Sequence, residues 1–435
     1  KFYEQIALPL LRCLEPEKAH DISITAMQSG LIPGPGRLTS DRLSIDIAGL
    51  KFPNPIGLAA GYDKNAMVIP QLMRMGFGFI EVGAVTPRPQ TGNQKPRVFR
   101  LNKDLGIINR FGFNNLGMKK IKNRLERHSD GGIVGLNIGA NKDSPNKAAD
   151  YSQVLCFTHK HISFATINIS SPNTKDLRKF HGEADLKKLL SQINIARQNL
   201  TKKLPIFLKI SPDLTLTDIK IIADLSLQFG IDGIIATNTT LTRENLLSKN
   251  KDEDGGLSGR PLFERSNQIL AQFSYETEGK LPLIGVGGIS SAKDAFVKIK
   301  AGASIIQLYS AIIYNGFSLI EKIFYELDDY RKENKIKNVK IVRIEQLYPF
   351  PFDTLGAVIS KHKDCEFLWV QEEPKNMGGW NTVRNYIQWS LEYIKAENKR
   401  VNYIGRDPGA SPASGYLKKH LAEQNEILEK VVGKF

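Results

Sequence analysis

The chain has 435 residues, of which 41% are hydrophobic and 24% are charged, and this length and composition predict two or three units with buried cores. A formal net charge of +15 is consistent with a solvated basic surface, or with anionic small molecules or lipids as partners. Nucleic acid is not an expected partner, because the lysines are scattered and no nucleic-acid motif occurs.

The three cysteines, Cys13, Cys156 and Cys365, lie far apart in the sequence. This spacing predicts a reducing compartment, with neither a disulfide framework nor a metal site. No apolar run reaches the roughly 18 residues of a membrane span, and we recognise no signal peptide.

The first 40 or so residues predict two short helices, FYEQIALPLLRCL and PEKAHDISITAMQSG, followed by the helix breaker IPGPG. Their basic and acidic side chains balance, so contact with a membrane would depend on apolar residues and not on charge. These residues are Phe2, Tyr3, Ile6, Leu8, Leu10 and Leu11. The alternative is that the same apolar face packs on the rest of the protein, and both possibilities stay open.

Eight short apolar runs follow, at residues 55–60, 78–83, 132–138, 164–169, 205–210, 232–237, 282–287 and 304–309. They are rich in Ile and Val, which is typical of strands that are covered on both faces. Stretches of helical pattern, such as residues 182–200, separate most of them. Strands that alternate with helices predict a (β/α)8 TIM barrel, and a doubly wound open sheet is the alternative.

Polar loops follow nearly every apolar run. They are GYDKN (61–65), GANK (139–142), SSPNT (170–174), SPD (211–213), NTT (238–240), GGI (287–289) and YS (309–310). In a barrel these strand ends converge on the face that carries the active site. Turn formation explains any one of these loops, but seven on one rim predict a functional site.

Three features of these loops indicate the kind of ligand. The glycines of GVGGIS (285–290) follow a strand and precede a helix, which favours a phosphate. The amides and aromatic rings of NRFGFNNLG (109–117) suit a flat polar ring. Lys64 and Lys209 lie at strand ends, where a lysine commonly pairs with a carboxylate, a phosphate or an electron-rich ring.

The stretch INISSPNT (167–174) places Ser170 and Ser171 just after a predicted strand, without a histidine beside them. A serine nucleophile usually needs a histidine base. The sequence therefore does not predict a catalytic triad at this loop.

At this point a resemblance becomes specific. AAGYDKN, INRFGFNNLG, NIGANKD, INISSPNT, ATNTT, GGLSGRPL, GVGGI and QLYS, in this order, resemble the dihydroorotate dehydrogenases over about residues 2 to 320. The N-terminal helices, and Ser171 where class 1 members carry cysteine, are similar to the class 2, quinone-reducing, membrane-associated type. The resemblance implies an FMN-dependent oxidation of dihydroorotate to orotate in pyrimidine synthesis. In such a reaction Ser171 would accept a proton as the catalytic base while flavin N5 accepts the hydride.

The resemblance also implies three sets of site residues. The substrate would contact Lys64, Asn109, Arg110, Phe111, Gly112, Phe113, Asn168, Asn173, Asn238 and Thr239. FMN would contact Ala60, Gly61, Lys64, Ala84, Asn137, Asn168, Lys209, Thr237, Gly259, Gly288, Tyr309 and Ser310. A quinone tunnel under the N-terminal helices would be lined by His20, Arg100 and Tyr309. Lys209 would stabilise negative charge on the reduced flavin, and Ala84 departs from the hydroxyl residue found in many relatives.

The implied partners are dihydroorotate or orotate and either ubiquinone or menaquinone. The implied location is peripheral, on the cytoplasmic side of a bacterial inner membrane, and the implied state is a monomer.

The C-terminal segment repeats none of the barrel pattern. VRIEQLYPFP (342–351), VQEEPKNMGGW (370–380) and GRDPGASPASGY (405–416) resemble the C-terminal end of the E1 component of 2-oxoglutarate dehydrogenase. The segment lacks that enzyme's thiamine-diphosphate-binding parts and the strand expected before YELDDYRKE, so we expect an appended α/β fragment without catalysis of its own. The predicted domains are residues 1–40, 41–323 and 324–435.

Two other functions remain as alternatives. The tail could dock on a 2-oxoacid dehydrogenase complex and make the chain a scaffold or binding protein, with the barrel as a passenger. The barrel could also bind a phosphorylated ligand for lyase or isomerase chemistry without a flavin.

Overall fold

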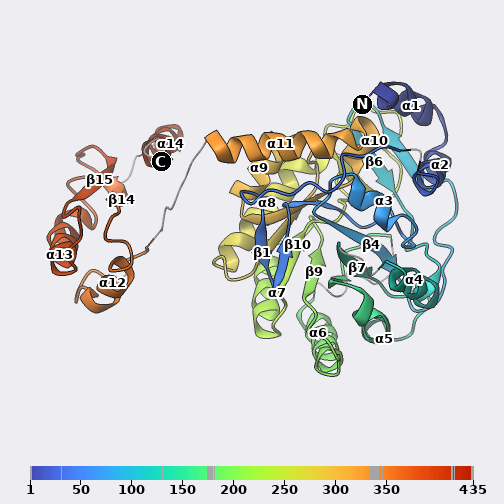
Figure 1. Ribbon diagram of the computed structural model, residues 1–435, viewed down its shortest axis with the longest axis horizontal. Coiled ribbons are helices and arrows are strands. Elements are labelled where there is room, and N and C mark those ends of the chain that lie inside the picture. Colours follow the sequence, from blue (N-terminus) through green and yellow to red (C-terminus); the bar gives the residue numbers. More distant parts are fainter. Residues whose placement is uncertain are drawn as a thin grey trace. The chain divides into compact units, whose positions relative to one another are not determined.

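The computed structural model describes residues 2–30, 32–128, 132–173, 180, 182–333, 342–344, 346–412, 415 and 417–432. The chain forms two compact units, Lys1–Tyr330 and Arg331–Phe435 (Figure 1).

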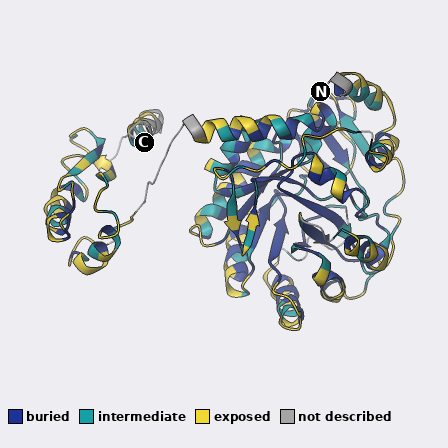
Figure 2. Cartoon of the chain, viewed as in Figure 1, coloured by how far each residue is buried: buried dark blue, intermediate teal, exposed yellow. Residues whose placement is uncertain are grey.

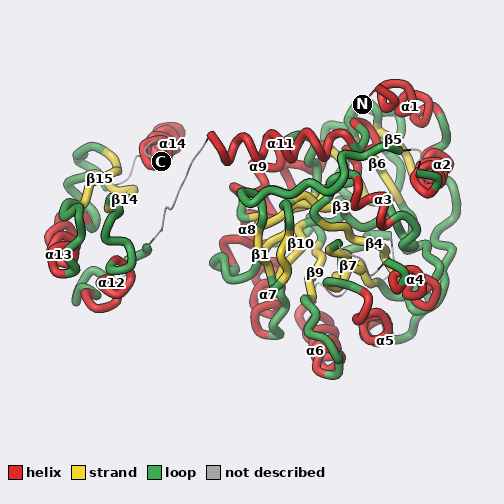
Figure 3. The backbone as a smooth tube through the Cα atoms, viewed as in Figure 1, coloured by secondary structure: helices red, strands yellow, loops and turns green. Residues whose placement is uncertain are grey.

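The first unit is built on a closed barrel of eight strands in the order β10-β12-β13-β3-β4-β7-β8-β9 (Figure 3). The strands are β3 (Ile56–Leu58), β4 (Phe79–Val85), β7 (Ile133–Ile138), β8 (Phe164–Asn168), β9 (Ile206–Ile210), β10 (Gly233–Ala236), β12 (Leu283–Val286) and β13 (Ala303–Leu308). All neighbouring pairs are parallel. Each predicted apolar run supplies one strand, so the (β/α)8 barrel is confirmed and the open sheet is wrong.

Helices lie outside the barrel strands and bury their apolar faces against them (Figures 1 and 2). They are α3 (Ile69–Arg74), α4 (Gly117–Glu126), α5 (Lys147–Thr158), α6 (Glu183–Gln198), α7 (Leu216–Gln228), α8 (Phe263–Glu276), α9 (Ala292–Lys300), α10 (Ser310–Asn315) and α11 (Ser318–Glu333). Local sequence fixes several of their starts. Helix α7, for example, begins with a capping box in which Thr215 and Asp218 satisfy each other's backbone N–H groups.

The interior of the barrel is filled by large apolar side chains. Phe79, Phe164 and Phe207 pack together there with Phe52 of a short hairpin, β1 (Ile45–Ile47) and β2 (Leu50–Phe52). This hairpin was not predicted. Because it supplies apolar side chains to the same core, it packs against one end of the barrel interior and leaves the strand ends at the other face to form a cavity.

A second unpredicted sheet lies among the loops at the carboxyl ends of the strands. It is antiparallel, in the order β11-β6-β5, and consists of β5 (Val98–Leu101), β6 (Gly106–Asn109) and β11 (Gly256–Gly259). Strand β6 ends at Asn109, where one predicted site loop begins, and β11 ends at Gly259, another predicted site residue. The pairing of β6 with β11 fixes these two segments relative to each other. Two of the predicted site segments are therefore part of a sheet and not of free loops.

The two predicted N-terminal helices are present as α1 (Phe2–Cys13) and α2 (Pro16–Gln28). Helix α1 lies beside α10, and α2 beside β5 (Figure 1). A buried ion pair of Glu17 with Arg97, at 2.6 Å, fastens α2. Ser318 donates its backbone N–H to Glu4 and fastens α1. Among the described helices, none is long and apolar enough to cross a membrane.

The second unit contains α12 (Phe352–Ile359), β14 (Phe367–Pro374), α13 (Trp380–Tyr393), β15 (Val401–Arg406) and α14 (Leu417–Val432). The appended α/β fragment is thus confirmed. Strands β14 and β15 form a parallel pair, and α12 and α13 share a small core with Val383 and Leu391 at its centre. The stretch YELDDYRKE (325–333), before which a strand was expected to be missing, is preceded by helix and not by a strand, because Ser318–Glu333 form the continuous helix α11.

Candidate active site

One cavity of about 600 Å³ opens at the carboxyl ends of the barrel strands and continues to the inner faces of α1 and α2. Every site residue implied by the sequence lines it, with the exception of Arg110. Of the seven predicted polar loops, five supply lining residues, whereas residues 139–142 and 211–213 do not line the cavity. The convergence of strand ends in a parallel barrel explains why residues distant in the sequence meet here.

Arg110 turns away from this cavity. Its guanidinium forms a 2.9 Å ion pair with Glu253, donates to the carbonyl of Pro96 and stacks 4.5 Å from the ring centre of Phe99. Its side chain therefore links the end of β6 to the loop that precedes β11. The expected contact of this residue with substrate is not supported.

A chain of buried amides and one carboxylate begins at the cavity wall and continues into the barrel core. Asn168 donates to Asn137 at 2.9 Å, and Asn137 donates to Glu81 at 2.6 Å. Gln307 donates to the other oxygen of Glu81, also at 2.6 Å. Asn238 donates to Asn168 at 3.3 Å. These bonds join β4, β7, β8 and β13 and fix the orientation of each amide that reaches the cavity.

The two neighbouring serines have different surroundings. Ser170 is fully buried, donates to Asn168 at 3.0 Å and accepts from Asn238 at 3.0 Å, so its hydroxyl supports the amide chain. Ser171 lines the cavity, and its Oγ accepts the backbone N–H of Asn173 at 3.3 Å. Within the described residues, no histidine is bonded to either hydroxyl.

The loop at residues 109–113 is held against the Ser171 loop. Asn173 donates its side-chain amide to the carbonyl of Asn109 at 3.1 Å. The ammonium of Lys64 lies 4.3 Å from the ring centre of Phe111, within the range of a cation–π interaction. The contact between Lys64 and Phe111 thus helps to position both the lysine and the 109–113 loop at the polar end of the cavity.

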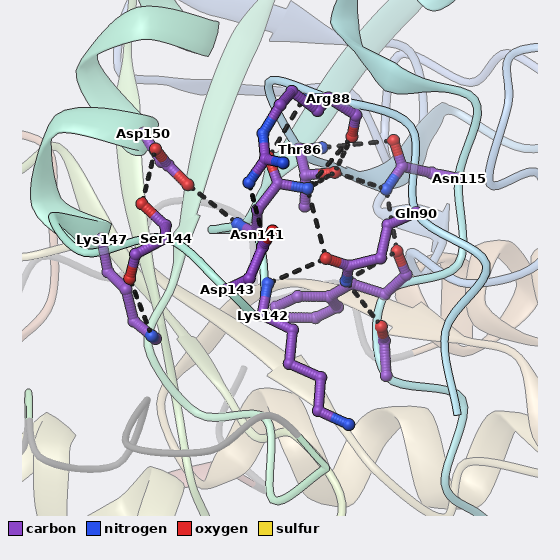
Figure 4. A network of polar contacts seen from close by, with 12 residues as sticks. Thr86, Arg88, Gln90, Asn115, Asn141, Lys142, Asp143, Ser144, Lys147 and Asp150 are labelled. Carbon is purple, nitrogen blue, oxygen red and sulfur yellow. Dashed lines mark hydrogen bonds and ion pairs between the residues drawn. The ribbon is translucent and has the colours of Figure 1, made fainter. Parts of the chain in front are cut away.

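A polar network behind this loop was not predicted (Figure 4). Gln90 donates to the carbonyl of Gly112 at 2.8 Å, and its Oε1 accepts the backbone N–H of Lys142 at 2.8 Å. Asn141 donates to Gln90 and to Thr86, each at 3.2 Å. The network connects the loop after β4 with the loop after β7 and supports the 109–113 segment from outside. The polar run TPRPQ (86–90) after β4 was the available signal.

Two lysines that line the cavity have pKa values lowered by burial. Burial lowers the pKa of Lys64 to about 8, although Glu17 acts in the opposite direction. Burial also lowers the pKa of Lys209, while Glu81 raises it. No hydrogen-bond acceptor for the Lys209 ammonium is present among the residues that the structure describes. Such a group favours an anionic or electron-rich ligand, because a buried charge without a partner is costly.

The geometry of the strand-end loops fits a phosphorylated, flat cofactor such as FMN. Within the described residues, the backbone N–H groups of Gly287, Gly288, Tyr309 and Ser310 have no acceptor, and all four residues line the cavity. Gly288 has a φ of +74°, and a Cβ there would lie 2.5 Å from the Cβ of Phe263. Only glycine allows this close turn, whose free N–H groups suit a phosphate.

The other end of the cavity, under α1 and α2, is mainly aromatic and aliphatic. Tyr62 makes edge-to-face contacts with His20, Tyr309 and Phe317, at centroid distances of 5.2, 5.8 and 5.7 Å. The hydroxyls of Tyr62 and Ser23 lie 2.5 Å apart. Burial, with a smaller contribution from Lys64, lowers the pKa of His20 to about 3, so this imidazole is neutral at physiological pH. Tyr62 and Ser23 were not predicted as site residues.

Arg100, at the same end, is already engaged by the N-terminal helix. Its guanidinium donates to the carbonyls of Arg12, Leu14 and Leu11 at 3.1, 2.6 and 3.3 Å. These are carbonyls at the carboxyl end of α1, where a cation complements the helix dipole. Arg100 therefore lines the cavity and also fixes the end of α1.

The C-terminal segment matches the 2-oxoglutarate dehydrogenase C-terminal family over residues 318–432. The match overlaps that of the barrel family within α11, at residues 318–330. The two similarities thus share one helix.

The barrel is similar to dihydroorotate dehydrogenases. The family model "Dihydroorotate dehydrogenase" matches residues 42–330. A protein of Cereibacter sphaeroides named dihydroorotate dehydrogenase (quinone) is 54% identical over 326 residues, which cover 75% of this chain and 92% of that protein. A Bradyrhizobium protein of the same name is 47% identical over 332 residues, with 75% and 91% covered.

A solved structure of a protein with this name is also similar to the barrel. DHODH from Eimeria tenella, in complex with ferulenol, superposes with a TM-score of 0.72 at 38% identity, covering 74% of this chain and 93% of that one. The scaffold alternative receives no support from these similarities, and the alternative of a flavin-free lyase or isomerase is wrong. The chain belongs to the dihydroorotate dehydrogenase family of FMN-dependent oxidoreductases.

Proposed function

We propose that this chain oxidises dihydroorotate to orotate and delivers the electrons to a quinone, as a step of pyrimidine synthesis. The observation that carries the proposal is the cavity itself. One continuous space joins a polar end built from strand-end amides, lysines and Ser171 to an apolar end under α1 and α2. The relatives named as quinone-dependent support the same acceptor here.

The proposed FMN site is the glycine-rich side of the cavity. It consists of Ala60, Gly61, Lys64, Ala84, Asn137, Asn168, Lys209, Thr237, Gly259, Gly288, Tyr309 and Ser310. When bound, FMN supplies the hydride acceptor of the reaction. The free N–H groups near Gly288 would hold its phosphate, and the ammonium of Lys209 places a positive charge in the buried part of the site.

Ser171 is the proposed base. A hydroxyl is a poor base in bulk water, so the site must exclude water and bond the oxygen as its charge grows. Ser171 is only 6% exposed, and its Oγ already accepts the backbone N–H of Asn173. As the oxygen takes a proton from the substrate carbon, it must release its own proton to a neighbouring acceptor or water.

The remaining polar groups bind and orient the substrate. Lys64, charged below about pH 8, pairs with the substrate carboxylate. The amides of Asn109, Asn168, Asn173 and Asn238, with Thr239, offer donors and acceptors to the ring. The backbone of residues 111–113 covers this part of the cavity.

The apolar end is the proposed quinone site, lined by His20, Arg100 and Tyr309. Four large apolar side chains of the N-terminal segment remain 41–64% exposed, which is unusual for such side chains gathered in one short segment. They are Ile6 and Leu10 on α1, Leu14 between the two helices and Ile22 on α2. They support peripheral contact with a membrane, and we propose that this is the cytoplasmic side of a bacterial inner membrane. The side chains of Phe2 and Tyr3, expected to take part, lie outside the described residues.

The C-terminal unit is proposed to carry no catalysis, because every residue of the proposed site belongs to the first unit.

The test is anaerobic mixing of the purified yellow protein with dihydroorotate. Loss of the visible flavin absorbance and formation of orotate, followed by recovery of the absorbance on addition of a quinone, support the proposal. A flavin that dihydroorotate does not reduce would contradict it.

A further inference from the structure

One buried lysine lies outside the cavity lining. Lys298, in α9, is completely inaccessible to solvent, and its ammonium donates to the hydroxyl of Ser266 in α8 at 2.5 Å. The same ammonium lies 5.5 Å from the ring centre of Phe263. None of the residues proposed to bind substrate, cofactor or quinone is in this group.

The group forms the underside of the glycine turn between β12 and α9. Ser266 Oγ lies 2.9 Å from the carbonyl oxygen of Phe263 and 3.2 Å from that of Gly287, so its one proton is shared between these two acceptors. A Cβ on Gly287 would lie 2.8 Å from Ser266 Oγ, and a Cβ on Gly285 would lie 3.0 Å from Cδ of Lys298. The lysine stem therefore passes beneath β12, and its amine ends below the turn whose other side faces the cavity.

The charge of this lysine has no ion-pair partner in the described part of the chain. Asp294, in the same helix, is instead bonded by the N–H and hydroxyl of Ser290, at 2.9 and 2.8 Å. Burial lowers the pKa of Lys298 to about 7, against the raising effects of Glu264 and Asp294. An apolar side chain would fill this position without the cost of a buried charge. An anion bound on the other side of the turn offsets that cost.

We propose that Lys298 is a positioning residue for the cofactor phosphate: through Ser266 it fixes the Gly287–Gly288 turn, and its charge lies beneath the phosphate bound there. The inference depends on the proposed placement of the FMN phosphate at this turn. It assigns to Lys298 no contact with cofactor or substrate.

The experiment compares the affinities of flavin-stripped, full-length protein for FMN and for riboflavin, which lacks the phosphate, by quenching of flavin fluorescence. For Lys298→Met we expect the Kd for FMN to rise about tenfold or more while the Kd for riboflavin changes much less, because only FMN carries the anion. Lys300→Met is the matched control, since it removes the same charge from an exposed position of the same helix, and we expect no change in the ratio of the two affinities.

Two further variants separate charge from hydrogen bonding and protect the test against misfolding. Lys298→Gln keeps a donor for Ser266 but removes the charge, and we expect it to lose preference for FMN as Lys298→Met does. Ser266→Ala keeps the charge, and we expect a smaller loss of that preference. Equal weakening for both flavins, or an unchanged FMN affinity in folded Lys298 variants, would overturn the inference. Wild-type protein that does not prefer FMN to riboflavin would instead contradict the proposed phosphate site.

Discussion

The two ends of the cavity are built in different ways. At the polar end, most functional side chains lie at or near the ends of barrel strands, and several are bonded to one another, as in the chain from Asn238 through Asn168 and Asn137 to Glu81. At the apolar end, the walls are two helices attached by few polar contacts, chiefly Glu17 with Arg97 and Arg100 with the end of α1. The polar end is therefore expected to keep its geometry when the apolar end is altered, and the two half-reactions should be separable.

The largest expected effect comes from the base. Ser171→Ala should keep its FMN and lose about 10²- to 10⁴-fold in the rate of flavin reduction by dihydroorotate, since general base catalysis contributes on this order. The loss should diminish as pH rises and hydroxide replaces the missing base. Stopped-flow absorbance measures this rate directly.

Ser170→Ala is the matched control for that variant. It removes a hydroxyl that supports Asn168 and Asn238 but does not line the cavity, so we expect a clearly smaller loss. Equal losses in the two variants would mean that Ser171 is not the base.

A smaller effect should appear in the pH dependence of orotate binding. Burial lowers the pKa of Lys64 to about 8, so the free enzyme holds this positive charge below that pH and loses it above. The orotate anion favours the charged form, so its Kd should be level below about pH 8 and rise about tenfold per pH unit above it. Fluorescence titration measures the Kd, and Lys64→Met should bind weakly with no such slope. A slope that survives in this variant would assign it to another group.

The smallest effect is expected on removal of the C-terminal unit. A chain that stops at Glu333, where α11 ends, should remain yellow and reduce quinone at the full rate, because the barrel closes before that point. Steady-state kinetics and thermal melting compare the two lengths. If the shortened chain folds but loses FMN or activity, the C-terminal unit takes part in function.

The sequence predicted what depends on local pattern. Eight Ile- and Val-rich runs became eight strands, and five of the seven polar loops after them became part of the cavity lining. The sheet of β5, β6 and β11 was missed because its strands are short and because β11 pairs with β6 from far along the chain. Arg110 was misplaced for the same reason, since its partner Glu253 is far along the chain.

Buried charges were predictable to different degrees. The burial of Glu81 could be read from the sequence, because this carboxylate lies inside the apolar run GFIEVG. The burial of Lys298 could not be read from the sequence, since this residue belongs to a helix that also carries the exposed Lys293 and Lys300. Only the packing of α8 and α9 under the glycine turn distinguishes it from a surface lysine.

The most direct test of separate half-reactions uses a chain without residues 1–38, or the milder Ala26→Trp, which places a large ring in the apolar end. In double-mixing stopped flow, we predict that dihydroorotate still reduces the flavin at the wild-type rate. Reoxidation by a long-chain quinone should be lost, while reoxidation by a small water-soluble quinone should persist. Unchanged reoxidation by the long-chain quinone, or loss of flavin reduction in a folded variant, would contradict the account.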